Sequence, residues 1–380
     1  ALNQAHRVKI DVEGTKILVY LDNEPLFSAS DASISSGTVA LFAQRSARFD
    51  NVLIGTNSST PKVVITRPTS YFVKTSNTLP VSAVARNVPA GGGVKFILDN
   101  GVFSFTDFTE PYSGQFSNLS RGDHIVKAII VNSSGNPIFN STNLDEDTNK
   151  VVGTSGKYLV AIGDSITNGV GDDFAADNES VDGRNLSWGY TPILNDLLSA
   201  QLSKPVIIVN EGIPGTKSGA GGGNGVSIVN STKARHTESK QWLILYGTND
   251  SGGTMPVPSG KNCTEAQLQA GDPSCTGTYK ANMRNIIKKL KGFNKVPVLA
   301  KVPYVKNATV SRDKLIQDYN TVINQLVTEH NIGVKPPDFY TYFKNHQGEY
   351  ADTLHPNGNG YISMANLWSD ALINSRILNP

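Results

Sequence analysis

The sequence predicts a multidomain protein in which two all-β segments precede an α/β domain. Three observations support this prediction: short strands separated by turn residues, a polar stretch after them, and strands that alternate with helical periods from residue 157 onward. Strands separated by helices form a parallel sheet that is covered on both faces. A chain of 380 residues is long enough for several such units.

Residues 1–57 are predicted to form strands joined by turns, one of them at Asp22-Asn23-Glu24-Pro25. The phrase Ala47-Arg48-Phe49-Asp50-Asn51-Val52 resembles the last strands of a jelly-roll, or laminin-G-like, domain. A whole domain of that kind needs many more strands, so either the chain is trimmed at its start or these strands complete another sheet. The expected strands are 6–12, 17–21, 37–42 and 49–54.

Residues 61–140 are predicted to form a β-sandwich, because several short apolar strands are separated by Gly, Pro and Asn clusters. The end of this segment, from Leu119 to Asn136, resembles bacterial immunoglobulin-like modules. It has no Cys–Trp–Cys signature, so an antibody-type domain is excluded. Residues 141–156 are polar and poor in large apolar groups, and we expect them to form a linker.

Residues 157–380 are predicted to form the α/β domain. Apolar residues recur at helical spacing from Tyr190 to Leu198 and again from Leu315 to Leu326, and Ser311 is the expected N-cap of the later helix. The expected buried strands are 158–162, 206–209, 242–246 and 296–300.

Composition limits the partners that this chain is expected to have. Its 34 basic and 32 acidic residues nearly cancel and form no basic stripe, so a nucleic-acid partner has little electrostatic support. No apolar run approaches the length of a membrane span. The chain starts at Ala1 and shows no signal peptide, which fits a processed or trimmed product.

The two cysteines, Cys263 and Cys275, lie in one polar loop. Their short spacing suits a local disulfide, while two free thiols in a reducing compartment are the alternative. We favour the disulfide because the chain has no other cysteine. A disulfide predicts an oxidising environment, and the protein is therefore expected to be secreted or otherwise extracytoplasmic.

Four polar blocks are expected at the carboxyl ends of the predicted strands, where open α/β sheets bind their ligands. Because these ends lie on one rim of a doubly wound sheet, residues far apart in the sequence can meet there. The blocks are Gly163-Asp164-Ser165, Asn210-Glu211-Gly212-Ile213-Pro214-Gly215, Gly247-Thr248-Asn249-Asp250 and Asp352-Thr353-Leu354-His355.

The residue types in these blocks are complementary. Serine is a weak nucleophile until a base takes its proton, and the imidazole of His355 is suited to that task near neutral pH. Asp352, three residues earlier, can hold the other ring nitrogen. The backbone N–H groups of Ser165 and Gly215 and the side-chain amide of Asn249 are candidate donors to an oxyanion.

These four blocks, in this order, resemble the GDSL, or SGNH, hydrolase family. The resemblance covers residues 158–356 and implies a flavodoxin-like three-layer fold and ester hydrolysis through an acyl-enzyme. It also implies that Ser165, Asp352 and His355 are catalytic, with Ser165, Gly215 and Asn249 as the oxyanion hole. The nucleophile block reads Gly-Asp-Ser-Ile in place of Gly-Asp-Ser-Leu, a variation that leaves the catalytic residues intact.

Each block also has a structural interpretation. Ser165 suits a helix N-cap, His355 a surface loop, Asn249 a turn, and Gly215 a position of positive φ. Asp164 and Asp250 are expected to have structural roles by accepting hydrogen bonds from loop amides.

Trp188 and Tyr190 are candidates for lining an acyl or sugar pocket, although their helical setting favours the core. The remaining histidines are scattered without metal-ligand spacing, so no metal site is expected, and the proposed chemistry needs no cofactor.

We therefore expect a secreted serine esterase that hydrolyses short-chain esters, with acetyl esters of carbohydrates as the favoured substrate, either small or linked to a polysaccharide. One alternative is a lipid-directed esterase, lysophospholipase or thioesterase of the same family. Another, from a different class, is a non-catalytic binding protein that keeps the fold. The sequence leaves the oligomeric state open.

Overall fold

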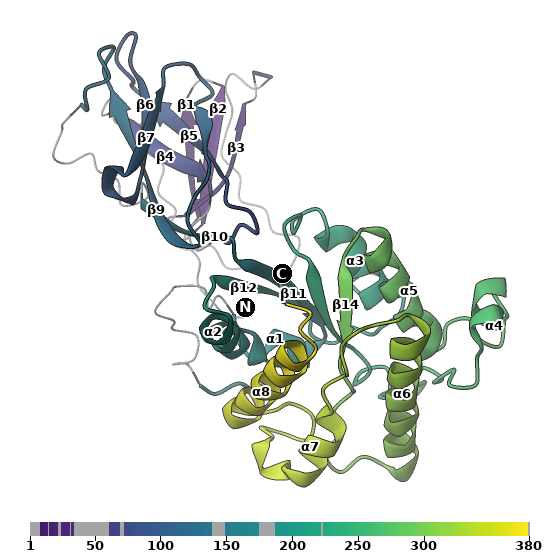
Figure 1. The fold of residues 1–380 in the computed structure, drawn as a ribbon. Helices are drawn as coiled ribbons and strands as arrows, with labels where there is room; N and C mark the ends of the chain where they lie inside the picture. Colours follow the sequence, from purple (N-terminus) through teal and green to yellow (C-terminus); the bar gives the residue numbers. More distant parts are fainter. Residues whose placement is uncertain are drawn as a thin grey trace. The chain divides into compact units, whose positions relative to one another are not determined.

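The computed structural model describes residues 8–13, 15–21, 24–30, 32–33, 61–68, 72–138, 149–174, 187–221 and 223–378. The chain divides into two compact units (Figure 1). The β-rich unit comprises residues 1–72 and 76–154, and the α/β unit comprises residues 73–75 and 155–380. No helix in the described ranges is long and apolar enough to cross a membrane.

The first sheet of the β-rich unit is antiparallel and has the order β1-β2-β3. Its first two strands match the predicted ones, whereas the expected turn at 22–25 is wrong at its end, because Glu24 and Pro25 already belong to β3. Proline is tolerated there because β3 is an edge strand. The strands expected at 37–42 and 49–54 lie outside the described residues. The strands are β1 (Val8–Glu13), β2 (Lys16–Leu21) and β3 (Glu24–Ser30).

Two further antiparallel sheets of this unit enclose one apolar core, as a sandwich requires. One sheet has the order β4-β5-β8 and the other β10-β9-β6-β7. The alternating burial along β5 shows the period of two that places every second side chain in this core. The strands are β4 (Lys62–Arg67), β5 (Leu79–Arg86), β6 (Gly93–Leu98), β7 (Phe103–Asp107), β8 (Ser113–Phe116), β9 (Gly122–Val131) and β10 (Asn149–Thr154).

Strand β10 corrects the expected linker over 141–156. It pairs with β9 along its whole length, and the sandwich therefore extends to Thr154, beyond the predicted boundary at residue 140. Val152 is fully buried in the unit. A segment can join a sheet through backbone hydrogen bonds even when it has few large apolar side chains. For this reason the composition of the segment suggested a linker.

The α/β unit contains a parallel four-stranded sheet of order β12-β11-β13-β14, and all four of its strands match predicted ones. Its central strand β11 lies between β12 and β13, which places the switch in strand order beside β11. The strands are β11 (Lys157–Gly163), β12 (Val206–Gly212), β13 (Gln241–Leu245) and β14 (Val296–Leu299).

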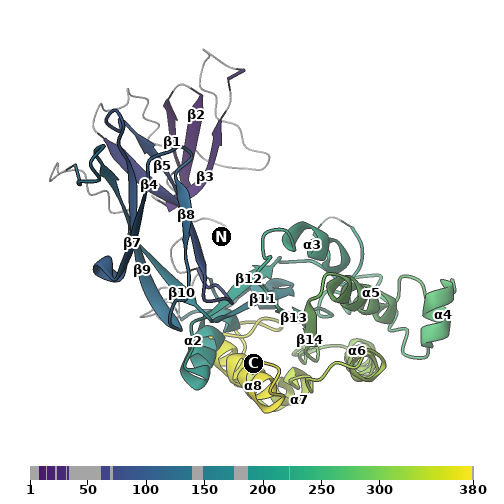
Figure 2. The same cartoon turned by 45° about the horizontal axis from the view of Figure 1, so that its top comes forward.

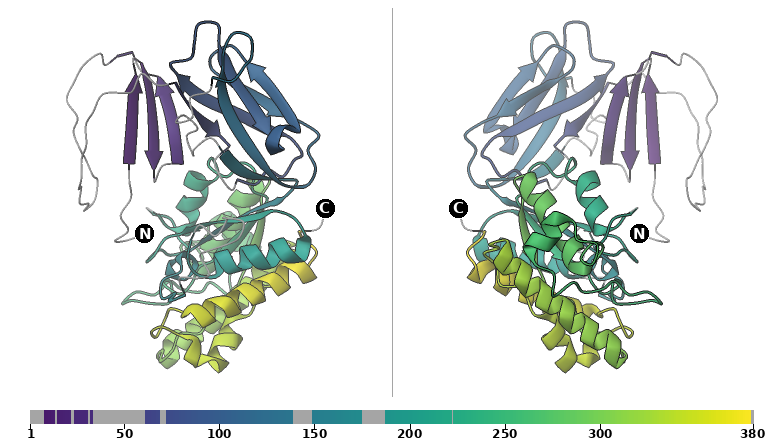
Figure 3. Two further views of the ribbon diagram at one scale, coloured as in Figure 1. Left: turned by 90° about the vertical axis from the view of Figure 1, so that its left-hand side faces the viewer. Right: turned by 90° about the vertical axis from the view of Figure 1, so that its right-hand side faces the viewer.

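Helices cover both faces of this sheet (Figure 2). The two helices α2 and α8 lie side by side (Figure 3) and share a core with alternate residues of the strands. Helices α3, α5 and α6 lie on the opposite face (Figure 1). The helices are α1 (Ser165–Asn168), α2 (Tyr190–Leu202), α3 (Gly225–Thr232), α4 (Glu265–Ala270), α5 (Tyr279–Gly292), α6 (Val310–Glu329), α7 (Phe339–Asn345) and α8 (Gly358–Asn374).

Both predicted helices are confirmed as α2 and α6, but the expected N-cap of α6 is wrong. The cap is Thr309, whose hydroxyl accepts a hydrogen bond from the backbone N–H of Arg312, and Ser311 lies inside the helix. Threonine caps a helix nearly as well as serine. The helix therefore begins at the earlier of the two available hydroxyl residues.

Candidate functional site

The first block forms the turn between β11 and α1. Asp164 is the N-cap of α1 and accepts a hydrogen bond from the Ile166 N–H at 3.0 Å, so Ser165 is the first helical residue and not the cap. A Cβ on Gly163 would lie 2.1 Å from the Thr167 hydroxyl oxygen and 2.6 Å from the Leu245 carbonyl oxygen. Glycine is thus required where β11 turns toward the serine.

The second block comprises the last three residues of β12 and the tight turn that follows. The Thr216 N–H donates to the Ile213 carbonyl at 3.3 Å, and Gly215 has a φ of 80°, the left-handed conformation that favours glycine. The Asn210 side chain donates to the Thr167 carbonyl at 2.6 Å and accepts from the Gly212 N–H at 2.9 Å. This block is thereby fastened to the helix that begins with Ser165.

The third block follows β13 and is joined to the second. The Asn249 side-chain amide donates to the Thr216 carbonyl at 3.0 Å, which leaves its second N–H for another acceptor. The Asp250 carboxylate is fully buried and accepts hydrogen bonds from the Ser218 N–H and hydroxyl. Asp250 therefore binds a loop amide, as expected, whereas Asp164 binds the Ile166 N–H inside α1 and caps that helix.

The fourth block is a short loop in front of α8. One oxygen of the Asp352 carboxylate accepts from the backbone N–H groups of Leu354 and His355, at 2.6 and 2.7 Å. The other oxygen lies 2.8 Å from Nδ1 of His355. The carboxylate holds both the backbone and the ring of His355, so the imidazole orientation is fixed from within the loop.

The serine and the histidine meet across 190 residues of sequence. Nε2 of His355 lies 2.9 Å from Oγ of Ser165, within hydrogen-bond distance for proton transfer. With the contact between His355 and Asp352, the three side chains form one continuous hydrogen-bonded chain. The interpretation of His355 as an ordinary surface residue is wrong, because both ring nitrogens have partners.

Burial raises the pKa of Asp352, but hydrogen bonds from the His355 ring and from the N–H groups of His355 and Leu354 outweigh it. The pKa of this carboxyl therefore lies below its ordinary value, and Asp352 is ionised at neutral pH. A negative charge on the Nδ1 side keeps Nε2 of His355 free to accept the serine proton and stabilises the imidazolium that results.

Burial has the opposite net effect on Asp164. Its complete burial raises the pKa to about 7, assisted by the charge of Asp250 and opposed by the hydrogen bond from Ile166. Oδ2 of Asp164 has no hydrogen-bond partner within the described part of the chain. An unpartnered oxygen in a dry site disfavours the charged form, and this explains the direction of the shift.

The two candidate pocket aromatics have different environments. Tyr190 is fully buried, packs in the core shared by α2 and α8, and places its hydroxyl 3.2 Å from that of Thr167. This agrees with our preference for a core position and not with the alternative of a pocket. Trp188 is 41% exposed, so our preference for a core position is wrong for this residue. Its backbone carbonyl accepts from the Asn210 side chain at 3.3 Å.

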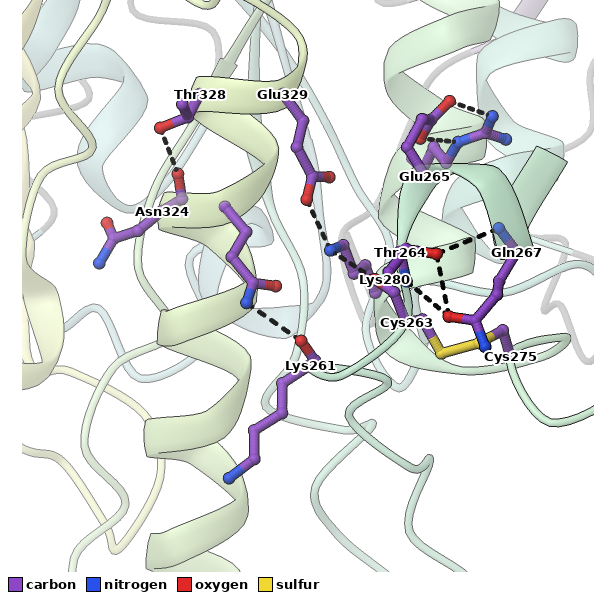
Figure 4. Close-up of polar contacts among 12 residues, drawn as sticks. Lys261, Cys263, Thr264, Glu265, Gln267, Cys275, Lys280, Asn324, Thr328 and Glu329 are labelled. Carbon is purple, nitrogen blue, oxygen red and sulfur yellow. Dashed lines mark hydrogen bonds and ion pairs between the residues drawn. A yellow bond between two sulfur atoms is a disulfide. The ribbon is translucent and has the colours of Figure 1, made fainter.

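The predicted disulfide between Cys263 and Cys275 is present. It lies in a loop that is fastened to α5 and α6 (Figure 4). The buried Lys280 ammonium donates to the Cys263 carbonyl at 2.8 Å and to the Glu329 carboxylate at 2.7 Å. Thr264 and Gln267 form a capping box at the start of α4. These contacts stabilise the loop that follows Asn249.

Sequence reasoning missed several residues that support the site. Ser218 holds Asp250, and Asp173 accepts a hydrogen bond from the Gly358 N–H at 2.7 Å, just beyond His355. A buried carboxylate such as Asp250 needs a hydrogen-bond donor. This need could have pointed to a polar loop residue such as Ser218. No spacing rule connects Asp173 to a residue 185 positions later.

Residues 161–361, more than half of the chain, match the model of the GDSL-like Lipase/Acylhydrolase family. No curated protein matches.

Among solved structures, the chain resembles LAE5, an alpha/beta hydrolase enzyme from the metagenome of Lake Arreo, Spain, with 20% identity over 59% of this chain and 97% of that one (TM-score 0.41). It also resembles the lipase/acylhydrolase from Enterococcus faecalis, with 20% identity over 57% and 96% (TM-score 0.40). A third is Axe2, an acetylxylan esterase from Geobacillus stearothermophilus, with 22% identity over 58% and 94% (TM-score 0.38). At these TM-scores the three similarities carry no weight for function.

Proposed function

The chain belongs to the GDSL-like lipase/acylhydrolase family and is a carboxylic ester hydrolase, and we propose that Ser165, His355 and Asp352 are its catalytic triad. The observation that carries this proposal is the hydrogen-bonded chain from Oγ of Ser165 through the His355 ring to the Asp352 carboxylate. These groups supply a nucleophile, a base and a residue that orients the base, which together are what acyl transfer requires.

In the first half of the reaction, Oγ of Ser165 attacks the ester carbonyl carbon while Nε2 of His355 takes the hydroxyl proton. The carbonyl π electrons move onto the oxygen, which becomes an oxyanion. When the tetrahedral intermediate collapses, the bond to the alcohol oxygen breaks and the imidazolium of His355 protonates the leaving alcohol. The acyl group remains attached to Ser165 as an ester.

Three donors are proposed to stabilise the oxyanion: the backbone N–H groups of Ser165 and Gly215 and the side-chain amide of Asn249. In the described ranges, neither backbone N–H donates a hydrogen bond to another residue. The Asn249 amide is held by the Thr216 carbonyl, so it is oriented before substrate binds. Donors that are fixed in advance stabilise the transition state without reorganisation.

In the second half, a water molecule attacks the acyl carbon and transfers a proton to Nε2 of His355. The second tetrahedral intermediate collapses, the acid leaves, and Oγ of Ser165 recovers the proton from the imidazolium. Because Asp352 remains ionised throughout, it stabilises the imidazolium in both halves.

Short-chain esters, with acetyl esters of carbohydrates favoured, are the proposed substrates. The loops after the second and third blocks are rich in polar residues and glycine, over 217–225 and 251–262, which is unlike the lining of a long acyl groove. The all-β unit ahead of the hydrolase is proposed to contain an immunoglobulin-like module that acts as a spacer or as an attachment to polymer.

The protein is proposed to act outside the cytoplasm. The support for this location is the Cys263–Cys275 disulfide, because such bonds persist in oxidising compartments and are rare in reducing ones.

The test of the catalytic assignment is hydrolysis of p-nitrophenyl acetate by the intact protein and by Ser165→Ala. Removing the nucleophile is expected to lower kcat by at least about 10³-fold, as for other triads whose members act as a unit. Thr167→Ala removes a neighbouring hydroxyl from the same helix and serves as the matched control. Equal rates for the intact protein and Ser165→Ala would exclude Ser165 as the nucleophile and make a binding protein the better proposal.

The substrate class needs a separate measurement. A series of nitrophenyl esters from acetyl to palmitoyl is expected to show kcat/KM falling as the acyl chain lengthens. A maximum at long chains would instead favour the lipid-directed esterase.

A further inference from the structure

A short segment after the nucleophile helix lies against the loop that carries His355. We call this segment, residues 170–174, the brace. The Asp173 carboxylate accepts a hydrogen bond from the Gly358 N–H at 2.7 Å, and the Tyr361 hydroxyl donates to the Val170 carbonyl at 2.7 Å. Both bonds join the brace to the first turn of α8, which begins three residues after His355.

The packing between the brace and the histidine loop is too close for side chains at two positions. A Cβ on Gly171 would lie 2.6 Å from the Pro356 carbonyl oxygen and 2.9 Å from Cβ of His355. A Cβ on Gly358 would lie 2.4 Å from the Phe174 ring. The brace therefore contacts His355 itself as well as the helix behind it.

The other end of the brace is fixed to the nucleophile helix. The Val170 N–H donates to the Ser165 carbonyl at 3.0 Å. The Asp172 carboxylate accepts from the Phe174 N–H at 3.1 Å and from the Gly189 N–H at 2.7 Å. The brace thus forms a direct connection from the backbone of Ser165 to the backbone that follows His355.

The contacts made by Asp352 do not provide this connection. They hold the His355 ring relative to its own loop, because Asp352 and His355 are three residues apart. The N-cap of α8 is Asn357, which accepts from the Gly360 N–H at 3.0 Å and leaves the Gly358 N–H for Asp173. A carboxylate at this position also interacts favourably with the positive end of the α8 dipole.

From these contacts we infer that Asp173 is a positioning residue, which holds His355 at hydrogen-bond distance from Ser165 through the Gly358 N–H. The inference rests on the proposed roles of Ser165 and His355. Its consequence is kinetic: a shift of about 1 Å between nucleophile and base can lower the rate about 10²-fold, while substrate binding is unaffected.

The test compares kcat and KM for p-nitrophenyl acetate in the intact protein, Asp173→Ala and Asp173→Asn. We expect Asp173→Ala to lower kcat about 10- to 100-fold with KM unchanged within about twofold. Asp173→Asn should recover most of the rate, because its side-chain oxygen accepts the same N–H. The rate of Ser165 labelling by a fluorophosphonate should follow kcat, since it depends on the same serine–histidine geometry.

A matched control separates positioning from general stability. Asp272 is a half-buried carboxylate that likewise accepts a backbone N–H, from Ser274 at 2.9 Å, but it lies in the disulfide loop. Asp272→Ala should leave kcat unchanged. If Asp173→Ala does not remain folded at the assay temperature, Tyr361→Phe removes the second bond to the brace and should show the same selective loss of kcat.

The inference is overturned if folded Asp173→Ala keeps kcat within about threefold of the intact protein, or if the asparagine variant is as impaired as the alanine variant. Failure of this inference can be distinguished from failure of the proposed function. If the proposed function is wrong, Ser165→Ala retains activity. If only the role of Asp173 is wrong, Ser165→Ala is inactive and the brace variants have normal activity.

Discussion

Replacing Asp164 by asparagine should remove the pH dependence of stability that is due to this carboxyl, which directly precedes Ser165. The Asp164 side chain is fully buried, and its pKa is raised to about 7 by desolvation, with a contribution from Asp250. In the unfolded chain the same carboxyl has an ordinary pKa near 4. Between about pH 4 and pH 7 the folded protein therefore binds one proton more than the unfolded chain.

The sign of the effect follows from this difference in bound protons. Stability falls as pH rises wherever the folded state binds more protons, at about 1.4 kcal/mol per pH unit and per proton. From pH 5 to pH 7 this group should therefore lower the free energy of unfolding by about 2–3 kcal/mol. Well above pH 7 the carboxyl is ionised in both states, and its contribution no longer changes with pH.

Asparagine keeps the oxygen that caps α1 through the Ile166 N–H, but it cannot ionise. The absolute stability of Asp164→Asn also includes the cost of burying the new amide, so the informative quantity is its change with pH. Titrating groups that do not interact with Asp164 cancel in the comparison. Asp250, whose pKa is also raised by burial, interacts with Asp164, so the measured difference includes this coupling.

Urea unfolding at pH 5, 6, 7 and 8 measures this quantity. We expect the free energy of unfolding of the intact protein to fall relative to that of Asp164→Asn by about 2–3 kcal/mol between pH 5 and pH 7, and then to run parallel. Two profiles that are parallel from pH 5 upward would refute the reasoning, because Asp164 would then be ionised in the folded protein throughout.

Two further predictions concern the oxyanion donors and the disulfide. Asn249→Ala should lower kcat for p-nitrophenyl acetate about 10²- to 10³-fold with a small change in KM, whereas a loss under threefold would remove Asn249 from the oxyanion hole. Replacing both Cys263 and Cys275 by serine should lower the free energy of unfolding by about 3 kcal/mol with kcat unchanged, measured by urea unfolding and steady-state kinetics. Unchanged stability would show that the contacts of Lys280 hold the loop without the disulfide.

The sequence by itself predicted the four strands of the α/β unit, its helices α2 and α6, and the residues of the proposed site. Buried strands such as 158–162 are continuous apolar runs, and α2 repeats its apolar residues at the helical period. The spacing of apolar residues along the chain therefore predicts the element and its buried face. The first three blocks lie at the ends of β11, β12 and β13, and parallel strands bring their carboxyl ends to one rim. The fourth block, which lies between α7 and α8, was assigned to the same site from the resemblance of all four blocks to one family. Ser165, Asn249 and His355 could therefore be selected together before any distance was known.

Only the tertiary structure decided which residues hold that site together. The bond between Asp173 and the Gly358 N–H joins positions 185 residues apart, and no local pattern marks either of them as a partner. The same holds for β10, which is defined by its pairing with β9 and not by its composition.

The protonation of Asp164 and the exposure of Trp188 are likewise properties of the folded chain. Both depend on what the rest of the protein places around a side chain. Periodicity predicts which face of an element is buried, but the neighbours that bury it come from distant segments. Those neighbours are determined only by the tertiary fold.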